Sequence, residues 1–126
     1  MYRDEALSAI NKIKMTTYET QMEINNKQKE LSDYINNLKN CKEKILSELK
    51  EQYLNTDYLE RIDGVIKKMT NALSHSKTIL DNLSSDATNE INSIVDSYNS
   101  SIDPKHPETP LEYEKIELTS VSGIDY

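Results

Sequence analysis

The sequence predicts an all-α fold: a long antiparallel hairpin of two coiled-coil-like helices, followed by a non-helical C-terminal tail. The three prolines all lie between positions 104 and 110, and the first 103 residues hold a single glycine, Gly64. The two residue types that most disfavour helices are therefore nearly absent from that stretch. Apolar residues recur there in steps of three and four, the period of one helix face. Because 36% of the 126 residues are hydrophobic, a narrow apolar stripe is favoured over a deep globular core.

We expect the first helix over about residues 3–52. Its stripe repeats at intervals of seven, with one polar member: Ile10, Thr17, Ile24, Leu31, Leu38 and Ile45. Residues 25–30 are polar all round, so a break at Asn25–Asn26 is the alternative to one continuous helix. Cys41 is the only cysteine, and its position between Leu38 and Ile45 predicts a small buried residue. Met15, Tyr18 and Met22 form a second, offset stripe.

The second helix is predicted over about residues 58–101, after a turn at 53–57. Asn55, Thr56 and Asp57 favour a turn, and Asp57 with Glu60 matches a capping box. Positions spaced by seven follow, with the period of a coiled coil: Leu59, Ile66, Leu73, Leu80, Ala87 and Ile94. Residues 84–90 can instead start a third helix, so a three-helix bundle is the alternative. Because the stripe crosses this segment in register, we favour continuity.

Residues 103–126 form a proline-rich linker and an extended tail. The prolines recur every third residue, which favours a polyproline-type conformation, and the following alternation places Glu114, Ile116 and Leu118 on one side. The tail can add as a strand to a partner sheet or remain a disordered acidic terminus. We expect deletion of residues 111–126 to leave helicity and melting temperature nearly unchanged. A third possibility is folding back onto the hairpin through Leu111, Tyr113, Ile116 and Leu118.

The charge pattern and hydropathy argue against nucleic-acid binding and membrane insertion. Residues 103–126 hold six acidic and two basic residues, and the first 102 hold sixteen acidic and thirteen basic ones. No basic stripe exists to neutralise phosphates. No run approaches the ~20 apolar residues that span a bilayer, and the N-terminus lacks a signal-peptide pattern. We expect a cytoplasmic protein, whose export, if any, follows a non-Sec route.

No catalytic, cofactor or metal signature is present. His75 and His106 are too far apart in sequence for a clustered metal site, and Gly64 stands alone, so no glycine loop can hold phosphate. Narrow helical bundles also rarely provide a concave pocket. The sequence therefore predicts a non-enzymatic protein without a cofactor.

One stripe per helix buries too little apolar surface to offset the ordering of about 100 residues. Flanking apolar residues such as Val65 and Ile79 also need a second surface. We therefore expect the hairpin to dock on another helical pair, either a second copy or a different protein. The predicted partner interface comprises Leu31, Leu38, Ile45, Leu59, Ile62, Ile66, Met69, Leu73, Leu80, Leu83 and Ile94.

The tail carries Tyr113-Glu-Lys-Ile-Glu117, which fits the pattern Tyr-x-x-x-Asp/Glu just beyond a two-helix hairpin. This arrangement resembles the small helical hairpin proteins of type VII (ESX) secretion in Gram-positive bacteria, in particular the helical partner proteins of LXG-type toxins. The resemblance implies that the chain pairs with a helical partner and that Tyr113 and Glu117 are the secretion signal. Residues 53–58 lack the Trp-x-Gly turn of the secreted hairpins, which favours an adaptor or chaperone over an export substrate.

Three functional hypotheses follow. The first is an adaptor that pairs with a toxin for type VII export. The second is a self-associating structural coiled-coil protein, such as a phage or cellular scaffold component. The third is an acidic inhibitor that occupies a basic site on an enzyme.

Overall fold

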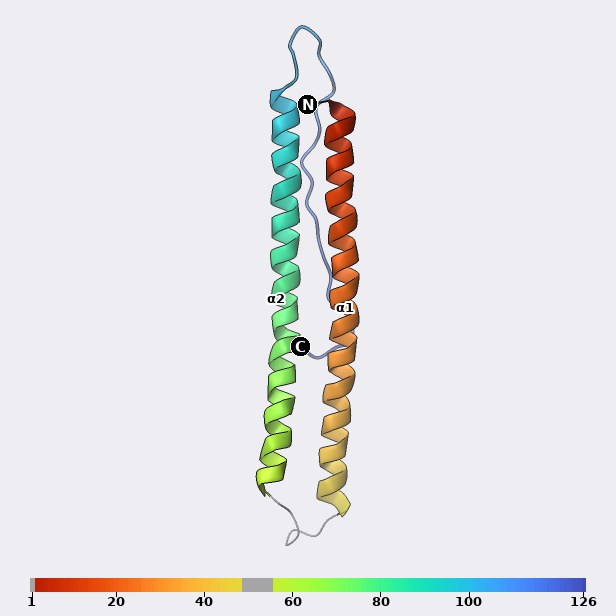
Figure 1. Cartoon of the computed structure of the whole chain (residues 1–126), viewed down its shortest axis with the longest axis vertical. Helices are drawn as coiled ribbons and strands as arrows, with labels where there is room; N and C mark the ends of the chain where they lie inside the picture. Colours follow the sequence, from red (N-terminus) through yellow and green to blue (C-terminus); the bar gives the residue numbers. More distant parts are fainter. Residues whose placement is uncertain (1, 49–55) are drawn as a thin grey trace. The chain divides into compact units, whose positions relative to one another are not determined.

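The computed structural model describes residues 2–48 and 56–126, which contain two long helices and no strand. Helix α1 spans Arg3–Glu48 and helix α2 spans Thr56–Ser100 (Figure 1). The predicted all-α fold is confirmed. Helix α1 continues through Asn25–Asn26, and α2 continues through residues 84–90, so neither alternative break occurs.

The predicted helix boundaries differ by a few residues from those in the structure. Helix α2 begins at Thr56, ahead of the predicted start. Asp57 lies in its first turn, where its negative charge interacts favourably with the positive end of the helix dipole. The predicted end of the first helix at 49–52, and residues 53–55 of the predicted turn, lie outside the described residues. Residues 101–126 contain neither helix nor strand.

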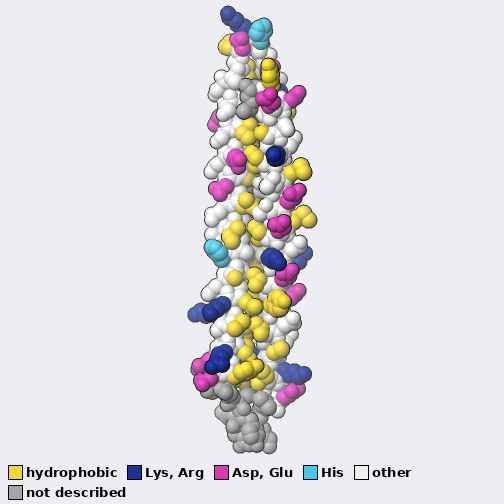
Figure 2. Space-filling view, in the orientation of Figure 1, with side chains coloured by type: hydrophobic (Ala, Val, Ile, Leu, Met, Phe, Trp, Pro, Cys, Tyr) yellow, Lys and Arg dark blue, Asp and Glu magenta, His cyan; other side chains and the backbone are white. Residues whose placement is uncertain are grey.

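The chain forms two compact units that share both helices. The first unit comprises Met1–Glu23 and Ile79–Thr119, and the second comprises Ile24–Thr78 and Ser120–Tyr126. In each unit a part of α1 lies antiparallel to a part of α2 (Figure 1). Apolar side chains gather along the line where the helices face each other, with charged side chains beside them (Figure 2).

The first unit has a core built from both helices and from the tail. Ile10 of α1 and three residues of α2 pack around the tail residue Ile116. The three from α2 are Ala87, Ile91 and Val95. Half-buried Leu111 and Leu118 from the tail add to this cluster. Nine of the twelve buried residues in the described part of the chain belong to this unit. The tail contributes to this burial, because it covers apolar side chains that two helices alone would leave exposed to solvent.

The second unit buries fewer side chains, and one of them is polar. Ile35 and Leu73 are buried together with Gln28, which is fully inaccessible to solvent. Lys42 of α1 and Asp63 of α2 form an ion pair at 2.6 Å. This unit is held by a thin apolar stripe with polar cross-links.

Cys41 is exposed, so the prediction of a small core residue was wrong. The buried face of α1 in this part of the helix contains Ile35, and half-buried Lys42 lies seven residues further on. Cys41 precedes Lys42 by one residue and therefore points about 100° away around the helix. The aliphatic stem of a lysine takes the place that the sequence analysis assigned to the thiol.

Substitutions of the neighbours Ile79 and Leu80 test which face of α2 packs inside the first unit. Leu80 is 1% exposed and Ile79 is 43% exposed. We expect Leu80→Ala to lower the free energy of unfolding by about 2–5 kcal/mol, because it leaves a cavity in the packed interface. Ile79→Ala, the matched control, should cost below about 1 kcal/mol. Urea unfolding of both variants measures the difference, and equal losses would contradict the packing.

Candidate functional site: a groove that holds the C-terminal segment

The site is a groove between the start of α1 and the end of α2 in the first unit. Residues 111–119, here called the tail segment, fill it as an extended chain that runs antiparallel to α2 (Figure 1). Side chains of both helices contact the tail segment. We call the surface that these helix side chains form the tail groove.

Two asparagines of α2 hold the main chain of the tail segment. The Asn99 Nδ2 group donates to the carbonyl oxygen of Leu111 at 2.9 Å, and its Oδ1 accepts the Leu111 N–H at 2.8 Å. Asn92 makes the same pair of bonds with Glu114, at 3.0 and 2.9 Å. Each side-chain amide thus satisfies one donor and one acceptor of the main chain, as a neighbouring strand would.

Hydroxyl and amide groups continue this recognition along the tail segment. Thr88 Oγ1 accepts the Ile116 N–H at 2.9 Å, and the Ser84 hydroxyl donates to the Ile116 carbonyl oxygen. On the α1 side, Gln21 Oε1 accepts the Thr119 N–H at 2.9 Å. At Leu111, Glu114 and Ile116, both main-chain groups therefore bond to side chains of α2 without the segment entering a sheet.

The spacing of the α2 side chains matches the rise of an extended chain. From Asn99 to Asn92 the helix rises about 10.5 Å, and from Asn92 to Thr88 about 6 Å. The tail advances three residues between the two asparagines, about 10 Å, and two residues to Thr88, about 6.6 Å. Steps of seven and four also keep these side chains on one helix face.

Apolar contacts fix which side of the tail segment faces the helices. Burial alternates from Glu114 to Thr119, with Ile116 buried and Leu118 half-buried on the inner side, as the sequence alternation predicts. Burial of Ile116, which is 4% exposed, contributes about 1.5–3 kcal/mol. Glu114 also points inward, and its Oε1 lies 2.7 Å from Lys14 Nζ.

The structure selects the fold-back among the three possibilities for the tail, with one correction. Leu111, Ile116 and Leu118 contact the helices, whereas Tyr113 is 66% exposed. The alternation slips between Leu111 and Glu114, where two consecutive residues face solvent. Because the tail completes the core, deletion of residues 111–126 should lower stability, which reverses the expectation from the sequence.

Tyr113 and Glu117, the predicted signal residues, both lie on the outer side of the tail segment. The Tyr113 hydroxyl donates to Asp96 Oδ1, and Glu117 forms an exposed ion pair with Lys115 at 3.5 Å. The two residues are therefore accessible, and they belong to a segment whose main chain is held in place.

The predicted partner interface divides into two classes in the structure. Leu73 and Leu80 are buried within the chain itself. The other nine are half-buried: Leu31, Leu38, Ile45, Leu59, Ile62, Ile66, Met69, Leu83 and Ile94. Larger exposed apolar side chains lie elsewhere, at Met15, Tyr18 and Met22 in the first unit and at Tyr58 and Val65 in the second.

The polar residues of the tail groove were missed by the sequence analysis. The signal that could have found them is a row of small polar residues beside the apolar stripe of α2, at positions 84, 88, 92 and 99. Each has a side chain that can bond to a main chain, and their spacing keeps them next to Ile91, Val95 and Tyr98.

In the second unit, the end of the tail satisfies the buried Gln28. Its Nε2 donates to Ser76 Oγ at 2.9 Å, and its Oε1 accepts the Tyr126 hydroxyl at 2.9 Å and the Val121 N–H at 3.3 Å. Lys77 Nζ lies 5.1 Å from the centre of the Tyr126 ring, within the range of a cation–π contact. A buried amide is costly unless it is bonded, so this arrangement fixes the last residues of the chain.

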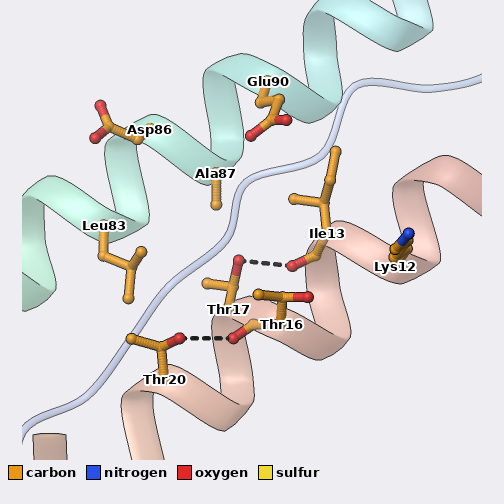
Figure 3. A pocket seen from close by; sticks show the side chains of 9 residues that line it. All are labelled: Lys12, Ile13, Thr16, Thr17, Thr20, Leu83, Asp86, Ala87 and Glu90. Atoms are coloured by element: carbon orange, nitrogen blue, oxygen red, sulfur yellow. Dashed lines mark hydrogen bonds between the residues drawn. The ribbon is translucent and has the colours of Figure 1, made fainter.

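A shallow cavity of about 390 Å³ lies in the first unit (Figure 3). The Thr17 and Thr20 hydroxyls donate to carbonyl oxygens of their own helix, while Asp86 and Glu90 lie across from Lys12. Apolar side chains, three threonines and three charged side chains line the cavity together. The lining residues are Lys12, Ile13, Thr16, Thr17, Thr20, Leu83, Asp86, Ala87 and Glu90.

Within residues 2–48 and 56–126, no three His, Cys, Asp or Glu side chains are grouped so that they could hold a metal ion. Neither described helix is long and apolar enough to cross a membrane. Comparison of the chain with protein-family models, with curated proteins and with solved structures finds no match.

Two tyrosines beside the tail donate hydrogen bonds to carboxylates. The Tyr98 hydroxyl lies 2.7 Å from Glu108 Oε2, and this bond, together with burial and the Glu108 charge, raises the pKa of Tyr98. The hydrogen bond to Asp96 and the charge of that carboxylate raise the pKa of Tyr113. In both cases ionisation would remove the donor and set two negative charges side by side.

Truncation of Ile116 tests whether the tail segment is part of the core. We expect Ile116→Ala to cost about 2–4 kcal/mol in urea unfolding, because the side chain is buried against both helices. Lys115→Ala, on the outer side, should change stability by less than about 0.5 kcal/mol. Hydrogen exchange at the amides of residues 111–119 should accelerate only in the Ile116 variant, and equal protection in both would contradict the assignment.

The raised pKa values of Tyr98 and Tyr113 predict a late phase in alkaline titration. Their neutral forms are favoured by folding, so this stabilisation is complete below pH 10 and is lost as the pH rises through the raised pKa values. Absorbance at the phenolate band should show two late-ionising tyrosines, which the double variant Tyr98→Phe/Tyr113→Phe lacks. Glu108→Gln should bring the pKa of Tyr98 down, and an unchanged profile would refute the assigned hydrogen bond.

Proposed function

We propose that the chain is a non-enzymatic helical adaptor that pairs with another helical protein. The observation that carries this proposal is the exposed apolar stripe of α1 in the first unit. Met15, Tyr18 and Met22 are 64%, 43% and 64% exposed, and their spacing of three and four residues places them on one helix face. Such a stripe is the surface that a partner helix covers.

The chemistry of this stripe suits a helix better than a flat or charged ligand. Methionine side chains adapt to irregular surfaces, and Tyr18 combines an apolar ring with a polar end. Asn11, four residues before Met15, continues the same face in polar form. The stripe is therefore short, about two helical turns, and polar at its N-terminal end.

The second unit also has exposed apolar residues that recur on one face of a helix. Tyr58 and Val65 are exposed on α2 and lie seven residues apart, and Ala72 follows after another seven. A repeat of seven residues is the period at which two helices keep contact along a coiled coil.

We propose in addition that the adaptor delivers its partner to type VII secretion, with Tyr113 and Glu117 as the recognition residues. The support is the resemblance of the motif and the fact that both side chains are exposed on an anchored segment. A signal whose main chain is already ordered loses less conformational entropy when a receptor binds it.

Charge substitution in the α1 stripe tests the adaptor function. We expect Met15→Asp/Met22→Asp to abolish cross-linking to the partner in the native cell, because it places carboxylates against an apolar surface. Helicity should be unchanged, since both positions are exposed. Met15→Leu/Met22→Leu is the matched control and should retain the partner, identified by mass spectrometry. A purified homodimer that the Asp variant dissociates would instead favour the structural coiled-coil protein.

Substitutions in the tail segment test the proposed secretion signal in the same cells. Tyr113→Ala/Glu117→Ala should retain the partner but stop its appearance in the culture medium. Glu112→Ala, an exposed neighbour in the tail segment, should leave export unchanged. Export that survives the double substitution would refute the signal and leave the adaptor proposal intact.

A further inference from the structure

We propose that the tail groove is a binding site for extended peptides, and that it accepts residues 111–119 of a second copy of the chain in exchange for its own. This binding mode is independent of the helical pairing proposed above, because it uses different residues of the first unit.

The groove recognises main-chain groups, which every peptide carries. Asn99, Asn92 and Thr88 bond to the N–H groups of Leu111, Glu114 and Ile116, and the two asparagines also bond to carbonyl oxygens. None of these bonds depends on a side chain of the occupant. An extended segment from another molecule can therefore form the same bonds in the same register.

The remaining contacts restrict the occupant to a narrow sequence pattern. The groove requires apolar side chains at the places of Leu111, Ile116 and Leu118, and an acid at the place of Glu114 to meet Lys14. The pattern is apolar-x2-acid-x-apolar-x-apolar. The tail segment of a second copy meets all four conditions, so it is the occupant that the observations favour.

An empty groove would expose a continuous apolar surface. Ile91 and Val95 are 0% and 1% exposed while Ile116 covers them. Departure of the tail segment would uncover these side chains and leave the two asparagine amides without their partners. The groove therefore strongly favours a filled state, and a second copy restores every contact.

The linker before the tail segment can serve as the hinge for this exchange. Residues 103–110 are exposed throughout. Asp103 accepts hydrogen bonds from the main chain of Lys105 and His106 in a local turn, and Glu108 accepts one from the Tyr98 hydroxyl. Exchange needs the release of that bond, of the bonds that hold the tail segment and of the bonds from Val121 and Tyr126 to Gln28. The linker then changes direction, while both helices keep their structure.

Effective concentration decides when exchange occurs. A tail joined by a short linker is present at its own groove at about millimolar concentration. A free peptide at micromolar concentration therefore competes poorly with it. If the tail of the full chain is weakened, the apparent affinity for an added peptide rises in proportion to the fraction of empty grooves.

A labelled peptide with the sequence TPLEYEKIELTSV, residues 109–121, tests the proposal by fluorescence anisotropy. The full-length variant Ile116→Glu, which weakens its own tail and keeps the groove intact, should bind the peptide at least ~10-fold more tightly than the unaltered chain. Lys115→Glu, altered on the outer side of the tail, should behave as the unaltered chain. Adding Asn92→Ala to Ile116→Glu should weaken binding again, and a peptide with Glu at the place of Ile116 should not bind.

Equal peptide affinity for Ile116→Glu and Lys115→Glu, or no binding to either, would overturn the proposal. A second measurement covers the case in which Ile116→Glu loses helicity. Donor- and acceptor-labelled copies of the unaltered chain should acquire energy transfer as their concentration approaches the millimolar range, and excess peptide should suppress it. Absence of transfer at millimolar concentration would equally overturn the exchange.

Discussion

The structure of the first unit depends on side chains of a helix bonding to the main chain of an extended segment. An isolated extended segment leaves its N–H and C=O groups unsatisfied when it is buried, and this cost normally restricts such segments to sheets. Here Asn99, Asn92 and Thr88 supply the missing partners, so Ile116 can enter the core. The apolar contacts and the hydrogen bonds require each other, because neither set alone would offset the ordering of the tail.

This interaction also explains why the first unit buries more side chains than the second. Two helices in contact share one stripe, and their outer flanks stay open to water. In the first unit the tail segment closes one flank over Ile91 and Val95. The second unit uses a buried amide, Gln28, as a junction between both helices and the last residues of the chain.

Helix periodicity made both helices predictable from the sequence, since stripes over forty or more residues without internal proline have few alternatives. Cys41 was predicted to be buried, but the inner position in this part of α1 is occupied by the neighbouring residue, the half-buried Lys42. The tail alternation from Glu114 to Leu118 was predictable, but its docking was not. Docking depends on Asn92, Asn99, Thr88 and Gln21, whose side chains look like ordinary surface residues until the opposing main chain is known.

The ratio between the two backbone rises has a consequence for how this chain can vary. One residue of extended chain spans about 3.3 Å and one helical residue about 1.5 Å, so each tail residue corresponds to slightly more than two positions of α2. A single inserted residue between Leu111 and Ile116 would carry every later group past its partner, and it would also turn the inner side chains outward. The outward positions at Glu112 and Lys115 can therefore change identity freely, whereas the number of residues between the anchoring points cannot change.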